Sequence, residues 1–459
     1  MLNPFLKSRI TDCKSLVDKL GKHYEYVSIF GNYVSNKSIR VSTHSSSIDD
    51  TDNECGFVIK VYKDGRYSEY SCNDVRGLSV NKIIKALTLN NSVSDDYKVP
   101  LFNEEEHTED YLREDKDSYS DKEIIEKLIK LKDKAHKEKR LINFNIRYAK
   151  RETSSIFVSD KKCLSQKYDW INMMCYAVVK ENETIKNCFD ALGEASTSIA
   201  LSQAEEMADK VVKTAVKLID SKPIVPGKYT VITDPSVSGL IAHEAFGHGV
   251  EMDMFVKNRA KAKDYVGKYV ASELVDMYDG AASCVSNASY FFDDDGIEAG
   301  TTKIIDKGIL VNGISDALSA MELGTVPTGN GRRQSYSRKV YTRMTNTFFG
   351  KGESTFEEML KSVKHGYYIV QSSNGMEDPK NWQIQCVALY GIEIVDGKLT
   401  DNYVSPVIIS GYVVDLLKSI SMVSEDVHIH GSGMCGKGYK EWVYVSDGGP
   451  YLKTEAKLG

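Results

Sequence analysis

A break punctuated by Pro223 and Pro226 divides this chain into two parts with different patterns. Just before it, residues 199–220 repeat apolar side chains at three- and four-residue steps and predict a long helix, which must end there because proline cannot continue a helix. After it, short apolar runs separated by Gly, Asn and Asp are typical of a β-rich region. The length of 459 residues suits two or three domains. We therefore predict an α+β fold, with a mixed α/β N-terminal region over residues 1–222 and a β-rich C-terminal domain over residues 223–459.

Local patterns in the first part predict a hairpin, a second helix and a connection. Residues 56–70 hold two runs rich in Val, Ile and Tyr around an Asp-Gly pair, which suits the positive φ angles of a tight hairpin turn. Residues 121–140 repeat Ile, Leu and Ala at helical steps and predict an amphipathic helix. Residues 95–117 contain ten acidic and three basic side chains with few apolar anchors. We therefore expect an acidic, solvated connection over about residues 95–120.

Composition excludes several classes of protein. The net charge is −6 and there is no basic block, so the chain is a poor candidate for binding nucleic acid. No run approaches the roughly 18 apolar residues that a membrane span needs, and the N-terminus lacks the apolar segment of a secretory signal. The nine cysteines follow no framework spacing, which indicates reduced thiols. We expect a cytoplasmic protein with no membrane or nucleic-acid partner.

The most informative motif is His243-Glu244-x-x-x-His248, at the start of the C-terminal domain. In the shorter H-E-x-x-H helix of zinc peptidases, the two histidines share one helix face. One extra residue turns them about 140° apart in an ideal helix, so a wider turn or a helix end must bring the rings together. Gly247 would supply the backbone freedom for that turn. Two histidines and a glutamate can also be hydrogen-bonded polar groups of a buried helix.

A catalytic zinc site needs a third protein ligand and an open position for water. Cys435 lies in the glycine-rich stretch GSGMCGKG, where the backbone can approach another element closely. A lone cysteine is more often a small buried apolar residue, and strand histidines need no metal. From spacing alone the third ligand therefore stays open among five candidates: Cys435, His428, His430, Glu251 and Asp253.

The chain resembles the TldD/PmbA family of metallopeptidases, and its motif-bearing TldD-like branch in particular. Five blocks carry the resemblance, in the order of the family: HEAFGHGVEMD (243–253), DDDGIEAGTTKIIDKGILVNGISD (293–316), TGNGRR (328–333), RMTNT (343–347) and GMCGKG (433–438). The resemblance implies that His243, His248 and Cys435 bind one Zn²⁺ and that Glu244 is the catalytic glutamate. It also implies a dimer, either a homodimer or a heterodimer with a TldE/PmbA-like paralogue that has lost the motif.

The expected activity is zinc-dependent hydrolysis of extended or unfolded peptides. Glu244 would take the proton of a zinc-bound water and pass it to the departing amine. Because a thiolate ligand weakens the zinc as a Lewis acid, nearby donors would matter for the developing oxyanion, and the candidates are Arg343, Tyr336 and Tyr341. The alternative is a non-catalytic, zinc-stabilised subunit of a TldD/TldE-type complex.

Overall fold

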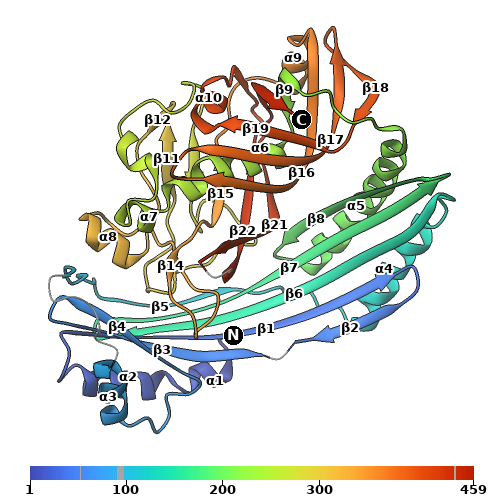
Figure 1. The fold of residues 1–459 in the computed structure, drawn as a ribbon. Helices are drawn as coiled ribbons and strands as arrows, with labels where there is room; N and C mark the ends of the chain where they lie inside the picture. Colours follow the sequence, from blue (N-terminus) through green and yellow to red (C-terminus); the bar gives the residue numbers. More distant parts are fainter. Residues whose placement is uncertain (52, 90–97, 439–440) are drawn as a thin grey trace.

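One long, curved sheet organises the first half of the chain and lies beneath the second half in Figure 1. The computed structural model describes residues 1–51, 53–89, 98–438 and 441–459. Within these ranges the sheet has eight strands in the order β4-β3-β1-β6-β7-β5, with β2 paired to β1 and β8 to β7. Its strands are β1 (Tyr26–Ser42), β2 (Ser46–Asp50), β3 (Glu54–Lys63), β4 (Arg66–Cys72), β5 (His107–Arg113), β6 (Leu141–Ser159), β7 (Lys162–Glu181) and β8 (Thr184–Glu194).

The two faces of this sheet have different neighbours. Helices cover one face and bury β1 side chains such as Ile29 and Ile39. The other face turns Phe30 and Phe157 towards Phe292 of the second half of the chain. Because successive side chains of a strand point to opposite faces, the sheet lies between the helices and the second half. The helices are α1 (Pro4–Lys7), α2 (Ile10–Leu20), α3 (Val80–Leu89), α4 (Asp121–Ala135) and α5 (Thr197–Lys217).

The hairpin and both helices predicted for this half are confirmed. The β3–β4 turn has positive φ at Asp64 and Gly65. The predicted helix 121–140 is shorter than expected: α4 begins with a capping box at Ser120 and ends at Ala135. The helix predicted over 199–220 is α5, followed by the 3₁₀ turn η1 (Leu218–Asp220).

The solvated connection expected over residues 95–120 is wrong for β5 (His107–Arg113). This segment pairs in parallel with β7 at the edge of the sheet. An edge strand needs only its backbone to pair, so its charged side chains can face solvent without the apolar alternation that reveals a strand in a sequence. Residues 95–97 lie outside the described residues.

The described part of the second half forms three smaller sheets. Six strands lie in the order β12-β11-β10-β15-β22-β21, and β13 pairs with β14. Seven strands form a sheet in which the β16–β17 pairing closes β16, β9, β23, β19 and β17 into a ring. The strands are β9 (Gly227–Thr233), β10 (Met277–Asp279), β11 (Thr302–Asp306), β12 (Ile309–Leu310), β13 (Gly331–Arg332), β14 (Tyr341–Thr342), β15 (Asn346–Phe349), β16 (His365–Asp378), β17 (Gln383–Val395), β18 (Lys398–Val404), β19 (Val407–Tyr412), β20 (Met422–Val423), β21 (His428–Lys437), β22 (Glu441–Gly449) and β23 (Leu452–Leu458).

Helix α6 (Pro235–Ala242) lies in the core of this half, against strands of both larger sheets. All eight of its residues are buried. At Gly239 a Cβ atom would lie 2.4 Å from the backbone nitrogen of Gly448, so only glycine allows the helix this close to β22. The other helices of this half are α7 (Met252–Val256), α8 (Ala317–Leu323), α9 (Phe356–Lys361), α10 (Val413–Lys418) and the 3₁₀ turn η4 (Lys261–Tyr265).

The fold is therefore mixed α+β, as predicted. The strands up to Glu194 belong to the first sheet and those from Gly227 onward to the other sheets. The boundary predicted at residues 222 and 223 lies between these two groups of strands. Among the described residues, no helix combines the length and apolar character needed to cross a membrane.

Candidate metal centre

Strand β9 and helix α6 bring the His243 side chain into the core. Asp234, the last residue before the helix, caps it by accepting a hydrogen bond from Val237 N at 2.8 Å, and Pro235 occupies the first helical position. The second carboxylate oxygen of Asp234 accepts from Gln371 N of β16 at 3.0 Å. The start of α6 is thereby tied to β16, and the helix delivers His243 at its far end.

The chain then widens into a π-helical turn, η2 (His243–Gly247), as the six-residue motif predicts. The His248 N–H donates to the His243 carbonyl, a bond five residues back along the chain. The two imidazole rings lie close together and nearly perpendicular, with centroids 5.1 Å apart. We predicted that Gly247 supplies backbone freedom for this turn. That reason is wrong, because the φ of −64° at Gly247 is ordinary for a helix. A Cβ atom at this position would lie 2.1 Å from Met344 Sδ, so glycine is needed for close packing.

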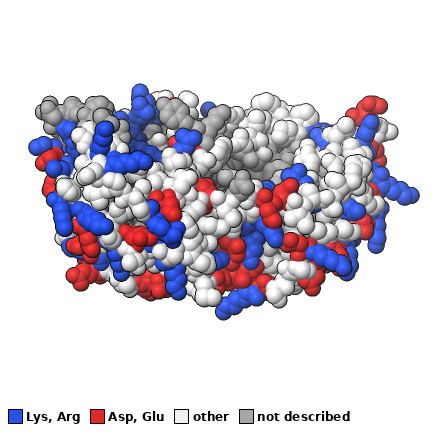
Figure 2. Space-filling model, turned by 90° about the horizontal axis from the view of Figure 1, so that it is seen from below, with Lys and Arg blue, Asp and Glu red and all other residues white. Residues whose placement is uncertain are grey.

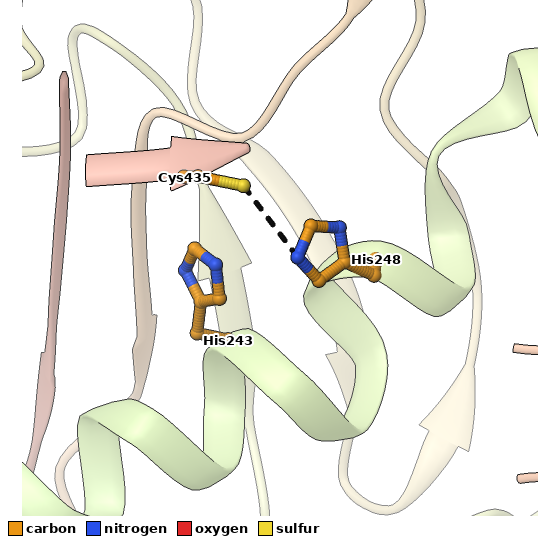
Figure 3. A group of neighbouring side chains, drawn as sticks. All are labelled: His243, His248 and Cys435. Atoms are coloured by element: carbon orange, nitrogen blue, oxygen red, sulfur yellow. Dashed lines mark hydrogen bonds between the residues drawn. The ribbon is translucent and has the colours of Figure 1, made fainter. Parts of the chain in front are cut away.

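Cys435 of β21 completes a group of three possible metal ligands. One ligand atom from each of His243, His248 and Cys435 lies within 4.8 Å of the other two. Figure 3 shows the Cys435 side chain reaching from its strand towards the two rings on the turn, with its Sγ 3.5 Å from His248 Nε2. His243 and Cys435 are buried, whereas the His248 side chain is 22% exposed.

The electrostatics of this group suit a soft metal ion. Burial alone raises the pKa of the Cys435 thiol, but the His248 and His243 imidazoles hold it well below its usual range. Buried His243 Nδ1 has no hydrogen-bond partner among the described residues, which is costly unless something binds there. Two imidazoles and a thiolate are the donor types that zinc prefers, so these residues suit a zinc ion.

Glu251 and Asp253 lie behind His248 and are not part of the ligand group. Glu251 Oε2 lies 3.3 Å from His248 Nδ1. Lys437 Nζ donates to Glu251 Oε2 at 3.0 Å and to Asp253 Oδ1 at 2.7 Å. Burial acts to raise the pKa of Glu251, but Lys437 and His248 lower it to about 2. Glu251 is therefore an anion that orients the His248 ring, as carboxylates behind metal-bound histidines do.

Replacing Glu251 with Gln should lower zinc affinity about tenfold, because a neutral amide holds the His248 ring less firmly. Competition with a chelating dye of known affinity measures this. Glu357→Gln changes the same group on the exposed surface of α9 and serves as the control. Equal zinc affinity in the two variants would contradict the orienting role of Glu251.

The competing pair His428 and His430 lies at the other end of β21. His428 is exposed, and neither histidine joins the group formed by His243, His248 and Cys435. A β-bulge between His430 and Gly433 separates the pair from the Cys435 end of the strand. The structure thus favours Cys435 among the five candidates that spacing alone leaves open.

Two carboxylates border the centre on the side of β16. Glu244 is buried against Gly375, where a Cβ atom would lie 2.5 Å from Glu244 Cγ. Two residues further on the same strand face, Glu377 approaches Gly249, and neither of its buried oxygens has a hydrogen-bond partner in the described part of the chain. Burial raises the pKa of Glu377 well above its usual range, and Glu244 raises it further.

Arg343 and Tyr336 do not lie where an oxyanion donor would be expected. Arg343 is 1% exposed and donates from its two terminal nitrogens to the carbonyls of Glu441 at 3.0 Å and Cys435 at 2.6 Å. Arg343 is therefore better described as a positioning residue that holds the β21–β22 pair. Tyr336 donates to Asn73 Oδ1 at 2.8 Å, against the first sheet.

The role predicted for Tyr341, as a donor to the oxyanion, stays a prediction. It lies in β14 beside the end of β21, where a Cβ atom on Gly438 would be 3.2 Å from its hydroxyl oxygen. The next residue, Thr342, accepts a hydrogen bond from Lys437 through its carbonyl.

Lys437 and Glu377 were not predicted as parts of the site. Lys437 follows Cys435 by two residues, so strand alternation could have placed both side chains on one face. Glu377 has no comparable signal, because only the packing of β16 against the π-helical turn brings it to the centre.

The chain is similar to known metalloproteases in sequence. Residues 226–456 match the family model of the PmbA/TldA metallopeptidase C-terminal domain. The chain is 32% identical over 286 residues to a metalloprotease of Methanocaldococcus jannaschii, which is 62% of each protein. It is 33% identical over 231 residues to a zinc metalloprotease TldD homolog of Saccharolobus solfataricus, or 50% of this chain and 51% of the relative. The chain thus spans about half to two thirds of the length of these relatives.

Solved structures share the fold. A putative modulator of a DNA gyrase from Thermotoga maritima superimposes with a TM-score of 0.80 at 21% identity, covering 98% of this chain and 100% of the other. TldE from Thermococcus kodakarensis superimposes with a TM-score of 0.75 at 18% identity, covering 97% and 99%. At such low sequence identity, these structures show only that the fold is shared.

Proposed function

Because the chain belongs to the PmbA/TldD metallopeptidase family, we propose that it is a zinc-dependent peptidase with its active site at His243, His248 and Cys435. The observation that carries the proposal is the convergence of these three side chains, from a π-helical turn and a strand almost 190 residues later, to within 4.8 Å. Zinc held there would lower the pKa of a bound water and polarise the scissile carbonyl.

The residues around the ligands have separate roles in this proposal. Glu244 follows the first ligand but is not one, and it acts as the general base that takes the proton of the attacking water and passes it to the departing amine. Glu251 holds the His248 ring through Nδ1. Arg343 holds the backbone carbonyl of Cys435.

Extended peptides are the proposed substrates. Strand β21, which carries Cys435, lies at the edge of its six-stranded sheet among the described residues. An extended peptide can pair its backbone with such an edge, whereas a folded protein offers no free strand to pair. Pairing through the backbone would also accept many sequences.

The alternative, a subunit in which zinc only closes the fold, is less well supported. A structural zinc site has four protein ligands. The described residues supply three at this centre, with a buried glutamate beside them. We also propose a dimeric working form, either a homodimer or a heterodimer with a TldE-like paralogue. The native mass of the chain, alone and mixed with such a paralogue, distinguishes the two forms.

Removal and return of zinc tests the proposed activity. The zinc-loaded protein should cleave a quenched fluorogenic peptide and a reduced, alkylated protein, and it should leave the same protein intact in its native form. Treatment with a chelator should abolish cleavage, and added zinc should restore it, because the ligands must hold the metal for activity. Cleavage that survives removal of the metal would contradict the proposal.

A further inference from the structure

A cleft of about 700 Å³ separates the long first sheet from the β21–β22 pair. One wall is the sheet face opposite the helices, formed by β1, β6 and β7, and the other includes Met434 and Trp442. Figure 1 shows β21 and β22 reaching down towards this face of the sheet. The volume is within the range of ligand-binding pockets, and none of the three proposed zinc ligands lines the cleft.

Two arginines on neighbouring strands place positive charge on the sheet wall of the cleft. Arg40 of β1 lies directly opposite Arg147 of β6 in the strand register, and both side chains are exposed. Arg147 donates to Ser38 Oγ, and neither arginine forms an ion pair with a described residue. Like charges directly opposite in a sheet are destabilising, and an anion bound between the two side chains would relieve this repulsion.

Apolar side chains accompany the arginines. Met174 lies next to Arg147 in the register and is 45% exposed. Met434 and Trp442, on the opposite wall, are 50% and 47% exposed. The flexible thioethers and the indole suit varied peptide side chains better than a regular phosphate backbone.

The cleft and the candidate metal centre lie on opposite sides of β21. Met434 and Cys435 are neighbours in this strand, so their side chains point to opposite faces. Met434 lines the cleft, whereas Cys435 faces the two histidines. A peptide paired with the edge of β21 would alternate in the same way and would turn every second side chain towards the cleft.

We propose that this cleft is a specificity site that binds acidic side chains of the extended peptide substrate, with Arg40 and Arg147 as their partners. The proposal rests on the proposed peptidase function, because it assigns the substrate class of that site. Arginine suits this role because its planar guanidinium can bind a carboxylate through two parallel hydrogen bonds.

The balance of charge in the cleft can be compared with that on the face of the molecule in Figure 2. Figure 2 shows Lys and Arg mixed with Asp and Glu over the face seen from below. Of the described charged residues that line the cleft, seven are basic and four are acidic. The acidic residues Asp49 and Glu54 form no ion pair with Arg40 or Arg147, so both guanidinium groups stay available for a ligand.

Peptide binding without cleavage tests the proposal. The zinc-loaded chain carrying Glu244→Gln is titrated with a fluorescein-labelled peptide that has Glu at alternate positions, and with a matched peptide that has Gln instead. Anisotropy at low salt should show the Glu peptide binding about tenfold more tightly, and high salt should reduce the difference because it screens exposed charges.

Charge reversal locates the binding site. Arg147→Glu should weaken the Glu peptide about tenfold and leave the Gln peptide within about twofold. Arg40→Glu should do the same, which provides a second variant. Lys122→Glu makes the same charge change on α4, outside the cleft, and should alter neither affinity.

Three results would overturn the proposal: equal affinity for the two peptides, the same loss with Lys122→Glu as with Arg147→Glu, or displacement of the Glu peptide by a lower concentration of single-stranded oligonucleotide. The last result would assign the cleft to nucleic acid. Because the experiment measures binding, its outcome is separate from that of the cleavage assay. If the cleft distinguishes the two peptides but the chain cleaves no peptide, the peptidase function is refuted and the assignment of the cleft still holds.

Discussion

Glu244→Gln should reduce peptide cleavage by about 10³-fold while zinc content stays at one ion per chain. Glutamine has nearly the same size and shape, but it cannot accept the proton of the attacking water, and general base catalysis contributes about 10²–10⁴-fold. Glu244 lies against Gly375 and is not one of the three converging ligands, so its replacement should leave the metal in place. Elemental analysis and cleavage of a fluorogenic peptide, measured on the same sample, test both parts.

This variant also separates the two functional hypotheses. Glu206→Gln, on the exposed surface of α5, provides a matched control that should retain full activity. A subunit in which zinc is purely structural makes no use of a free carboxylate beside the first ligand. Cleavage at the same rate in both variants would therefore rule out Glu244 as the general base.

Local sequence was a good guide wherever neighbouring residues determine the conformation. The Asp64-Gly65 turn, the ends of α5 and the wide turn from His243 to His248 depend on φ preferences, on prolines and on motif spacing. These signals need no knowledge of what packs against the element.

Tertiary contacts determine what local sequence could not show. Gly247 is needed because Met344, almost a hundred residues away, lies where a Cβ atom would be. Arg343 resembles an oxyanion donor in the sequence, yet its guanidinium binds the carbonyls of Glu441 and Cys435 inside the core. Such roles depend on which distant strand becomes the neighbour, and a single sequence does not record that.

The third ligand is the assignment that depends most on a distant contact, and two alanine substitutions test it. Cys435→Ala should weaken zinc binding by more than about 100-fold, beyond the effect expected for residues that only orient a ligand. His428→Ala should leave binding unchanged, because His428 is exposed and lies apart from the ligand group. Both variants remove a possible zinc ligand from the same strand, β21, so they form a matched pair.

Cobalt provides a readout that does not depend on activity. The cobalt-substituted chain should show a thiolate-to-metal charge-transfer band, and this band should disappear in Cys435→Ala and persist in His428→Ala, because only a bound sulfur produces it. Metal should also raise the thermal stability of the His428→Ala chain more than that of the Cys435→Ala chain, since a ligand that binds only the folded state stabilises it in proportion to its affinity. Greater loss of zinc from His428→Ala would move the third ligand to the far end of β21, away from the π-helical turn.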